Sequence, residues 1–302
     1  MAASNRDSHP DQLTFSGETN LFRKERMAIE RIRAHDPLAN GWMDKPYYTA
    51  YSGGKDSDVL RILMDLAGAR HDLVHNHTTV DAPETVRYVR SIPRIQINMP
   101  TYKGQPTSMW RLIAARGMPP TRRQRYCCEV LKEQGGADRM VVTGVRWAES
   151  AGRRMKRASL EARGKLMLNA DNDNHRRLFE SCTTKLKWVL NPIIDWTDTD
   201  VWAFLRYYKC QSNPLYQCGY RRVGCVGCPM AGRKWMLAEL EGYPKYRDNY
   251  IRAFSRMLAS RETEGKPLTK WGTGQDVYDW WVSQEAEADE AQFEFEEVDY
   301  EL

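Results

Sequence analysis

A glycine-rich turn near the start of the chain has residue types that can bind phosphate. It reads Ser52-Gly53-Gly54-Lys55-Asp56-Ser57. The residues before it, Tyr47–Tyr51, are aromatic and β-branched enough to form a short strand. After it, apolar residues at helical spacing predict a helix that starts around Asp56 and Ser57 and continues to Leu66.

A strand, a tight turn and a helix in this order aim backbone N–H groups and the positive helix end at one point, where a phosphate binds. Gly53 and Gly54 allow the sharp turn because glycine tolerates positive φ. Lys55 adds a flexible cation, and Asp56 can hold Mg²⁺ or order the loop. The spacing is not that of a Walker loop. We therefore predict that residues 52–57 bind nucleotide phosphates; an ordinary glycine turn is the alternative.

Two pairs of cysteines form a second chemical signal. Cys127 and Cys128 are adjacent, and Cys225 and Cys228 form a C-x-x-C pair. Four thiolates can hold a [4Fe-4S] cluster, and Zn²⁺ also accepts four. Adjacent cysteines point differently, so both reach one metal centre only where the backbone bends, which favours the cluster over zinc. The alternative is four reduced cysteines, some buried as small apolar side chains.

The charge distribution suggests an anionic partner. The chain has 302 residues, of which 41% are hydrophobic, and a net charge of +5. Residues 283–302 hold nine acids and no Lys or Arg, so the rest of the chain is strongly basic. Such a surface favours a nucleotide or a nucleic acid, although it can also serve solubility alone.

Two absences bear on the cellular compartment. The N-terminus lacks the apolar core of a signal peptide, and no apolar stretch approaches the roughly 20 residues of a membrane helix. We therefore expect a cytoplasmic protein with no membrane partner. Seven cysteines without a secretory signal also make structural disulfides unexpected.

Strand and helix patterns alternate along the chain. Further strands are predicted at 71–76, 94–98, 139–143 and 188–194, and helices at 18–34, 86–92, 108–116, 195–205 and 233–260. This alternation predicts an α/β fold with a Rossmann-like, doubly wound, mostly parallel sheet and a helical C-terminal extension. Right-handed crossovers bring the carboxyl ends of the strands to one edge, where ligands bind.

Two acids stand where the second strand ends and the next helix begins. Asp81 and Glu84 lie at this ligand-binding edge and can receive the ribose or the adenine amino group. A plain helix cap explains them equally well.

Together, these motifs resemble the phosphoadenosine phosphosulfate (PAPS) reductase family, the CysH-like branch of the adenine nucleotide α-hydrolase, or PP-loop ATP pyrophosphatase, superfamily. The resemblance covers roughly residues 47–281. It rests on residues 52–57, 81–85, 127–128, 144–150 with Arg153, 191–196 with 200–202, and 225–228.

The resemblance implies roles for individual residues. The loop would bind the phosphates of an adenine nucleotide, ATP or PAPS, with Mg²⁺. The nucleotide pocket would also include Gly144, Arg146, Glu149 and Ser150. Catalysis would depend on Lys55, Asp56, Arg146 and Arg153. Cys127, Cys128, Cys225 and Cys228 would hold a [4Fe-4S] cluster, as in the adenylyl-sulfate reductase and DNA-phosphorothioation branches.

One departure from the family shapes the expected reaction. The sulfonucleotide reductases use a C-terminal cysteine to attack the sulfate sulfur, whereas the last cysteine here is Cys228. We therefore expect an ATP α-hydrolase or adenylyltransferase that supports sulfur transfer, with nucleic acid as the acceptor. The basic runs 122–125 and 153–157 can bind its backbone, or can be a solvated face.

Two other functions stay open. The first is a PAPS or adenylyl-sulfate reductase that uses an external thiol. The second is a nucleotide-binding accessory subunit that joins protein partners in a nucleoprotein complex.

The predicted organisation has four parts. Residues 1–17 are polar and expected to be disordered. Residues 18–208 form the α-hydrolase-like domain, with a mobile basic insertion at about 151–179. A cysteine-containing loop and helical region occupy 209–282, and an acidic tail occupies 283–302.

Overall fold

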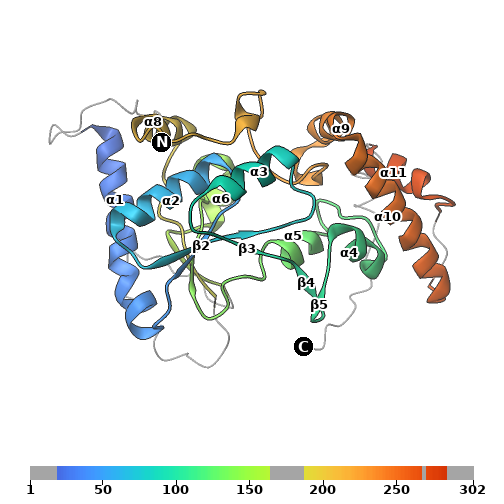
Figure 1. The fold of residues 1–302 in the computed structure, drawn as a ribbon, viewed down its shortest axis with the longest axis horizontal. Coiled ribbons are helices and arrows are strands. Elements are labelled where there is room, and N and C mark those ends of the chain that lie inside the picture. Colours follow the sequence, from blue (N-terminus) through green and yellow to red (C-terminus); the bar gives the residue numbers. More distant parts are fainter. Residues whose placement is uncertain (1–18, 164–186, 267–269, 284–302) are drawn as a thin grey trace. The chain divides into compact units, whose positions relative to one another are not determined.

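A computed structural model describes residues 19–163, 187–266 and 270–283 of the chain (Figure 1). The chain divides into two compact units that alternate along the sequence. The first, which we call the sheet unit, spans Met1–Asn76, Pro83–Asn98 and Gly135–Val223. The second, the helical unit, spans His77–Ala82, Met99–Gln134 and Gly224–Leu302.

The sheet unit is built on six strands within its described residues, in the order β3-β2-β1-β6-β8-β7. They are β1 (Tyr47–Ala50), β2 (His71–Asn76), β3 (Ile95–Asn98), β6 (Met140–Val142), β7 (Leu160–Arg163) and β8 (Lys187–Leu190). All neighbours pair in parallel except β7, which is antiparallel to β8. The predicted α/β, Rossmann-like, mostly parallel fold is confirmed.

The centre of the sheet is β1. Its Thr49 pairs with Leu73 of β2 on one side and with Val142 of β6 on the other. The chain moves from β1 outward to β3, then returns to the far side of β1 with β6. The direction therefore reverses between β1 and β6, and their carboxyl ends form the topological switch point at which such sheets bind ligands.

Helices flank this sheet (Figure 1). They are α1 (Asn20–Asp36), α2 (Lys55–Ala67), α3 (Pro83–Ser91), α6 (Ala151–Lys156) and α8 (Asp198–Tyr207), with shorter turns at Pro37–Trp42, Trp147–Glu149 (η2) and Pro214–Tyr216 (η3). The main core joins Ile32 of α1, Leu60 of α2 and Phe204 of α8 to Tyr47 of β1, all fully buried. The apolar spacing of these helices thus fixes α2, and with it the loop before α2, on the sheet.

The helical unit contains α4 (Met109–Arg116), α5 (Tyr126–Leu131), α9 (Arg233–Gly242), α10 (Pro244–Thr263) and α11 (Gly274–Val282), a hairpin of β4 (Thr101–Tyr102) and β5 (Gln105–Pro106), and a turn η4 (Pro229–Ala231). The ring centroid of Trp281 on α11 lies 4.6 Å from that of Tyr250 and 5.4 Å from that of Phe254, both on α10, and the Phe254 contact is edge to face. The Trp281 indole N–H donates to Pro120 O at 2.7 Å. These aromatic contacts hold the C-terminal helices together.

One strand of the sheet lies in a segment that was predicted to be an insertion. The strand β7 was not predicted, and it lies in the expected insertion at 151–179, whose residues beyond 163 fall outside the described ranges. Residues 1–17 and most of the acidic tail also lie outside them. The predicted domain boundary at 208 and 209 stays a prediction. Within the described residues, no helix combines the length and apolar character needed to cross a membrane.

Candidate functional site

The glycine turn joins β1 to α2 in a tight conformation. Gly53 has a φ of 75°, and Gly54 is the N-cap of α2. The helix begins at Lys55, slightly earlier than predicted, because the Ser57 hydroxyl folds back onto Gly54. Its Oγ donates to Gly54 O at 2.7 Å and accepts from the Gly54 N–H at 3.1 Å. This bonding places the first N–H groups of α2 at the carboxyl end of β1.

Residues from two distant segments hold the turn. A Cβ added to Gly53 would lie 2.9 Å from Val89 Cγ2 and 3.1 Å from Thr85 Cγ2, so α3 packs directly against the turn. The buried Asn213 side chain donates from Nδ2 to Gly53 O at 3.0 Å and to Thr85 Oγ1 at 3.1 Å. The turn is therefore fixed by side chains far from it in the sequence.

The loop after β6 contacts the start of α2, next to the glycine turn. A Cβ on Gly144 would lie 2.9 Å from Asp56 Cβ, which explains why glycine is needed there. Arg146 is 1% exposed, and its Nε donates to Asp56 Oδ1 at 2.7 Å. Its Nη2 donates to Asp198 Oδ1, also at 2.7 Å, and its Nη1 to Trp196 O at 3.3 Å. One guanidinium thus joins the two sides of the topological switch point.

Two cations and two carboxylates meet at this point. Lys55 Nζ lies 3.4 Å from Asp198 Oδ1 and 3.6 Å from Asp56 Oδ2. Partial burial alone would raise the pKa of Asp198, but Lys55 and Arg146 hold it below its ordinary value. The cations can bind phosphate oxygens, and the carboxylates are oxygen ligands of the kind that Mg²⁺ accepts.

The predicted residues Glu149, Ser150 and Arg153 lie beside Arg146. Glu149 accepts from the Arg146 N–H at 3.1 Å and forms an ion pair with Arg153. Ser150 caps α6, accepting from the Arg153 N–H at 3.2 Å. Burial and then the neighbouring Arg222 lower the pKa of Arg153. The contribution of Arg222 shows that positive charges lie close together here, and an anionic ligand would relieve their repulsion.

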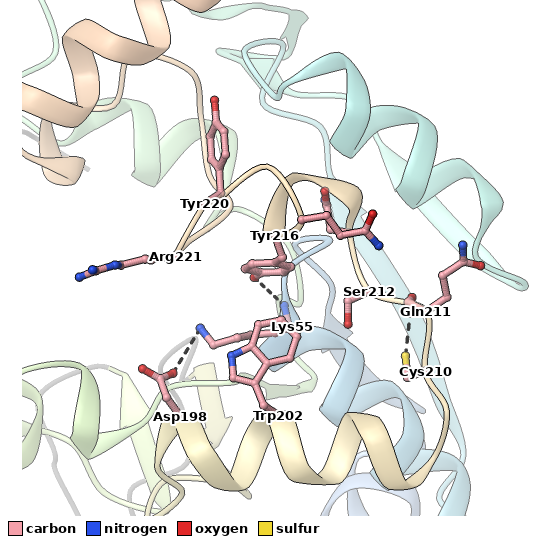
Figure 2. Close-up of a pocket in the computed structure, with 11 residues that line it drawn as sticks. Lys55, Asp198, Trp202, Cys210, Gln211, Ser212, Tyr216, Tyr220 and Arg221 are labelled. Atoms are coloured by element: carbon pink, nitrogen blue, oxygen red, sulfur yellow. Dashed lines mark hydrogen bonds and ion pairs between the residues drawn. The ribbon is translucent and has the colours of Figure 1, made fainter.

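A cavity of about 600 Å³ opens beside Lys55 (Figure 2). Trp202 of α8 and Tyr216 of η3 form part of its wall, and their rings meet edge to face with centroids 5.0 Å apart. Asp198 and Arg221 also line it, and Figure 2 shows both on the side to which the Lys55 side chain points. The volume and the aromatic and charged lining suit a small organic anion.

The two acids predicted to contact the nucleoside fall in different units. Glu84 opens α3 in the sheet unit and accepts from Arg87 at 3.1 Å. Asp81 belongs to the helical unit, where its Oδ2 accepts from the Thr78 N–H at 2.9 Å. A nucleotide-binding role for each stays a prediction.

All four predicted metal ligands lie in the helical unit. Cys127 and Cys128 are on α5, and Cys228 is the N-cap of η4. Cys225 is buried, pairs through its backbone with Asp81, and its thiol donates to Thr78 Oγ1 at 3.5 Å.

Neighbouring cysteine thiols shift the pKa values of Cys127, Cys128 and Cys225. A hydrogen bond with Cys128 raises the pKa of Cys127, and the nearby Cys225 and Cys228 raise it further. The same bond lowers the pKa of Cys128. Burial raises the pKa of Cys225 to about 11, against the effect of Lys132. The two cysteine pairs therefore lie close enough for Cys225 and Cys228 to influence the pKa of Cys127.

A cation accompanies this thiol group. The pKa of Lys132 is raised, chiefly by Cys225 and also by Asp81, Cys228 and Cys128. Four sulfur ligands with an adjacent ammonium fit a thiolate-bound metal centre, because the cation offsets the charge of the thiolates. A metal at these four cysteines, a [4Fe-4S] cluster or Zn²⁺, stays a prediction.

The model of the phosphoadenosine phosphosulfate reductase domain matches residues 46–231, which include the phosphate turn, Arg146 and all four cysteines. The chain belongs to the PAPS reductase family. The family model thus covers most of the sheet unit and, in the helical unit, residues 77–82, 99–134 and 224–231.

Two relatives are similar to this chain over most of its length or nearly two thirds of it. An uncharacterized protein of Methanocaldococcus jannaschii, MJ0973, is 27% identical over 279 residues, which are 86% of this chain and 62% of the relative. The PAPS reductase of Xanthomonas oryzae is 23% identical over 208 residues, 65% of this chain and 77% of the relative. The chain therefore spans less than two thirds of the archaeal protein.

Among solved structures, the PAPS reductase of Candida auris in complex with phosphate is similar to this chain. The match has a TM-score of 0.43 and 17% sequence identity, and covers 71% of this chain and 96% of the other.

The structure adds site residues that sequence reasoning missed in this family member. Asp198 was assigned only to a helix start, and Asn213 and Tyr216 only to a loop. Their partners, Arg146, Gly53 and Lys55, are 52 to 161 residues away, so no local pattern reveals these contacts. The position of Lys132 beside the cysteines could have been predicted, because Lys132 follows Cys128 by four residues, one helical turn.

Proposed function

We propose that this protein binds ATP on the turn at residues 52–57, cleaves it between the α- and β-phosphates and activates an acceptor for sulfur transfer, with nucleic acid as that acceptor. The observation that carries the proposal is the convergence of Lys55, Arg146, Asp56 and Asp198 at the β1–β6 switch point. Family membership supports an adenine nucleotide as the ligand.

The chemistry of this site is adenylyl transfer. An acceptor oxygen attacks the α-phosphorus, the bond to the bridging α–β oxygen breaks, and pyrophosphate leaves. Lys55, Arg146 and Arg153 stabilise the charge that develops on the phosphate oxygens. Asp56 and Asp198 would hold Mg²⁺, which neutralises the phosphate chain.

Sulfur transfer then needs no change of oxidation state at the acceptor. A donor at the sulfide level attacks the activated carbon, its electron pair forms the new C–S bond, and AMP leaves with the oxygen. The four cysteines would hold a [4Fe-4S] cluster, which when bound supplies redox or sulfur-handling chemistry. Lys132 would offset the charge of those thiolates.

Basic residues of the sheet unit support a polyanionic acceptor. Arg154 and Lys156 on α6 are exposed, as are Arg221 and Arg222 before the C-x-x-C segment. Arg222 also lowers the pKa of Arg153, so these side chains share one positive region. Such a region binds a phosphate backbone through release of counterions.

ATP labelled at the α-phosphate tests the proposal. With Mg²⁺ and a sulfide donor, the label should appear in AMP, and the yield should rise when DNA or RNA is added. Lys55→Met should abolish the product and Tyr207→Phe, an exposed change on α8, should not. Label found only in ADP would contradict α-cleavage, and tight binding with no product would favour the accessory-subunit function.

Family membership favours one second candidate, the reduction of PAPS with an external thiol. Two electrons from a dithiol such as thioredoxin would release sulfite and leave a disulfide. Sulfite formed from PAPS only when thioredoxin is present would establish this reaction instead.

A further inference from the structure

The first N–H group of α2 already has a protein partner. The Lys55 N–H donates to the Tyr216 hydroxyl oxygen at 2.8 Å. In an anion-binding helix terminus, this N–H points at the bound phosphate. The hydroxyl therefore stands where a phosphate oxygen would accept the same hydrogen bond.

Two neighbouring side chains surround Tyr216 at this contact. Its ring lies against Trp202, and Lys55 Nζ is 5.9 Å from its centroid (Figure 2). Burial raises the pKa of the Tyr216 hydroxyl, so the group stays neutral and makes a weaker partner for the helix end than an anion. The site thus holds a neutral oxygen that a charged one can replace.

We propose that the Tyr216 hydroxyl is a placeholder for a phosphate oxygen, and that the nucleotide must displace it from the Lys55 N–H. This inference rests on the proposed function, because it takes the turn at residues 52–57 as the phosphate site. It makes Tyr216 a determinant of nucleotide affinity rather than a catalytic residue.

Displacement has a consequence for the rest of the cavity. Tyr216 ends the turn η3, and Tyr220 and Arg221 of the same segment line the cavity. Asn213 anchors the start of that segment to Gly53 O. Movement of Tyr216 is therefore tied to the segment that carries Arg221, and phosphate binding would reposition this cation at the cavity.

Phosphate can bind only those molecules in which the Lys55 N–H is free of the hydroxyl. The apparent affinity for phosphate is therefore the intrinsic affinity multiplied by the fraction of such molecules. A neutral hydrogen bond of this kind corresponds to about a twofold to tenfold change in an equilibrium constant. Tyr216→Phe removes the competitor but keeps the ring beside Trp202. It should therefore bind inorganic pyrophosphate about twofold to tenfold more tightly than the wild-type protein.

Calorimetric titration measures the affinity of the wild-type protein and of Tyr216→Phe. The full chain is titrated with inorganic pyrophosphate and, in the presence of EDTA, with ATP. Tyr207→Phe is the matched control, because it removes an exposed hydroxyl of the same unit, and its affinity should equal that of the wild type. Equal or weaker binding by Tyr216→Phe, with binding by the wild type intact, would overturn only this inference. Failure of every protein to bind would overturn the phosphate site itself.

Tryptophan fluorescence gives a second measurement of the displacement of Tyr216, and it does not depend on whether Tyr216→Phe folds. Because the rings of Trp202 and Tyr216 are in contact, displacement of Tyr216 should change the emission of Trp202. Pyrophosphate should therefore change the emission of the wild-type protein, and most of this change should disappear in Trp202→Phe. If pyrophosphate changes the emission of Trp202→Phe as much as that of the wild-type protein, or changes neither although both bind it, displacement of Tyr216 is refuted.

Discussion

Gly53→Ala tests how tightly the phosphate turn is held. At a φ of 75°, any residue other than glycine costs about 1–2 kcal/mol. The new Cβ would also lie 2.9 Å from Val89 Cγ2 and 3.1 Å from Thr85 Cγ2, and such overpacking adds about 1–3 kcal/mol. Together these terms predict a loss of about 2–5 kcal/mol in the free energy of unfolding.

Gly68→Ala is the matched control. Gly68 has nearly the same φ, 67°, at the other end of α2, but no atom lies within 4 Å of its added Cβ. It should lose only the backbone term, about 1–2 kcal/mol. Any change in the entropy of the unfolded chain is common to both variants and cancels in the comparison.

Urea denaturation followed by circular dichroism measures both losses, and titration with ATP measures binding. Gly53→Ala should be the less stable variant by about 1–3 kcal/mol and should bind ATP at least tenfold more weakly. Gly68→Ala should bind ATP as the wild type does. Equal stability of the two variants, or normal ATP binding by Gly53→Ala, would show that contact with α3 does not fix the turn.

Three further changes test other parts of the account. Gly144→Ala places a Cβ 2.9 Å from Asp56 Cβ, so calorimetry should show ATP affinity reduced at least tenfold; unchanged affinity would contradict the close approach of the two loops. Burial raises the pKa of Asp58 from 3.8 to about 6, so its contribution to stability is lost as pH rises from about 4 to 6. Urea titrations at several pH values should therefore show a smaller decline for Asp58→Asn than for the wild type, by about 3 kcal/mol, and parallel profiles would refute the assignment. Anaerobically purified Cys225→Ser should lose bound iron and visible absorbance, whereas the exposed Cys218→Ser should keep both; equal iron in the two variants would exclude Cys225 as a ligand.

Much of the sheet unit could be predicted from local patterns. The second strand was predicted at residues 71–76, and β2 spans His71–Asn76. The turn at 52–57 joins a strand to a helix as expected, because glycine and apolar periodicity are short-range signals. The strand β7 was missed because it is short and carries the charged Glu161 and Arg163, as an edge strand can.

The parts of the site that escaped prediction depend on distant residues. Asp81 and Glu84 are three positions apart, yet they belong to different units, which no local signal reveals. Tyr216 reaches Lys55 across 161 residues, and Asp198 reaches Arg146 across 52. The four cysteines could be grouped because their residue type limits their chemistry. Tyrosine and aspartate have many ordinary roles, so only the fold shows their part in the site.

Identification of the phosphate product of ATP tests the central claim most directly. With Mg²⁺, an acceptor and a sulfide donor present, phosphorus NMR should show AMP and pyrophosphate in equal amounts, and Lys55→Met should form neither. ADP and inorganic phosphate as the products would contradict the account, because they would place the cleavage at the γ-phosphate.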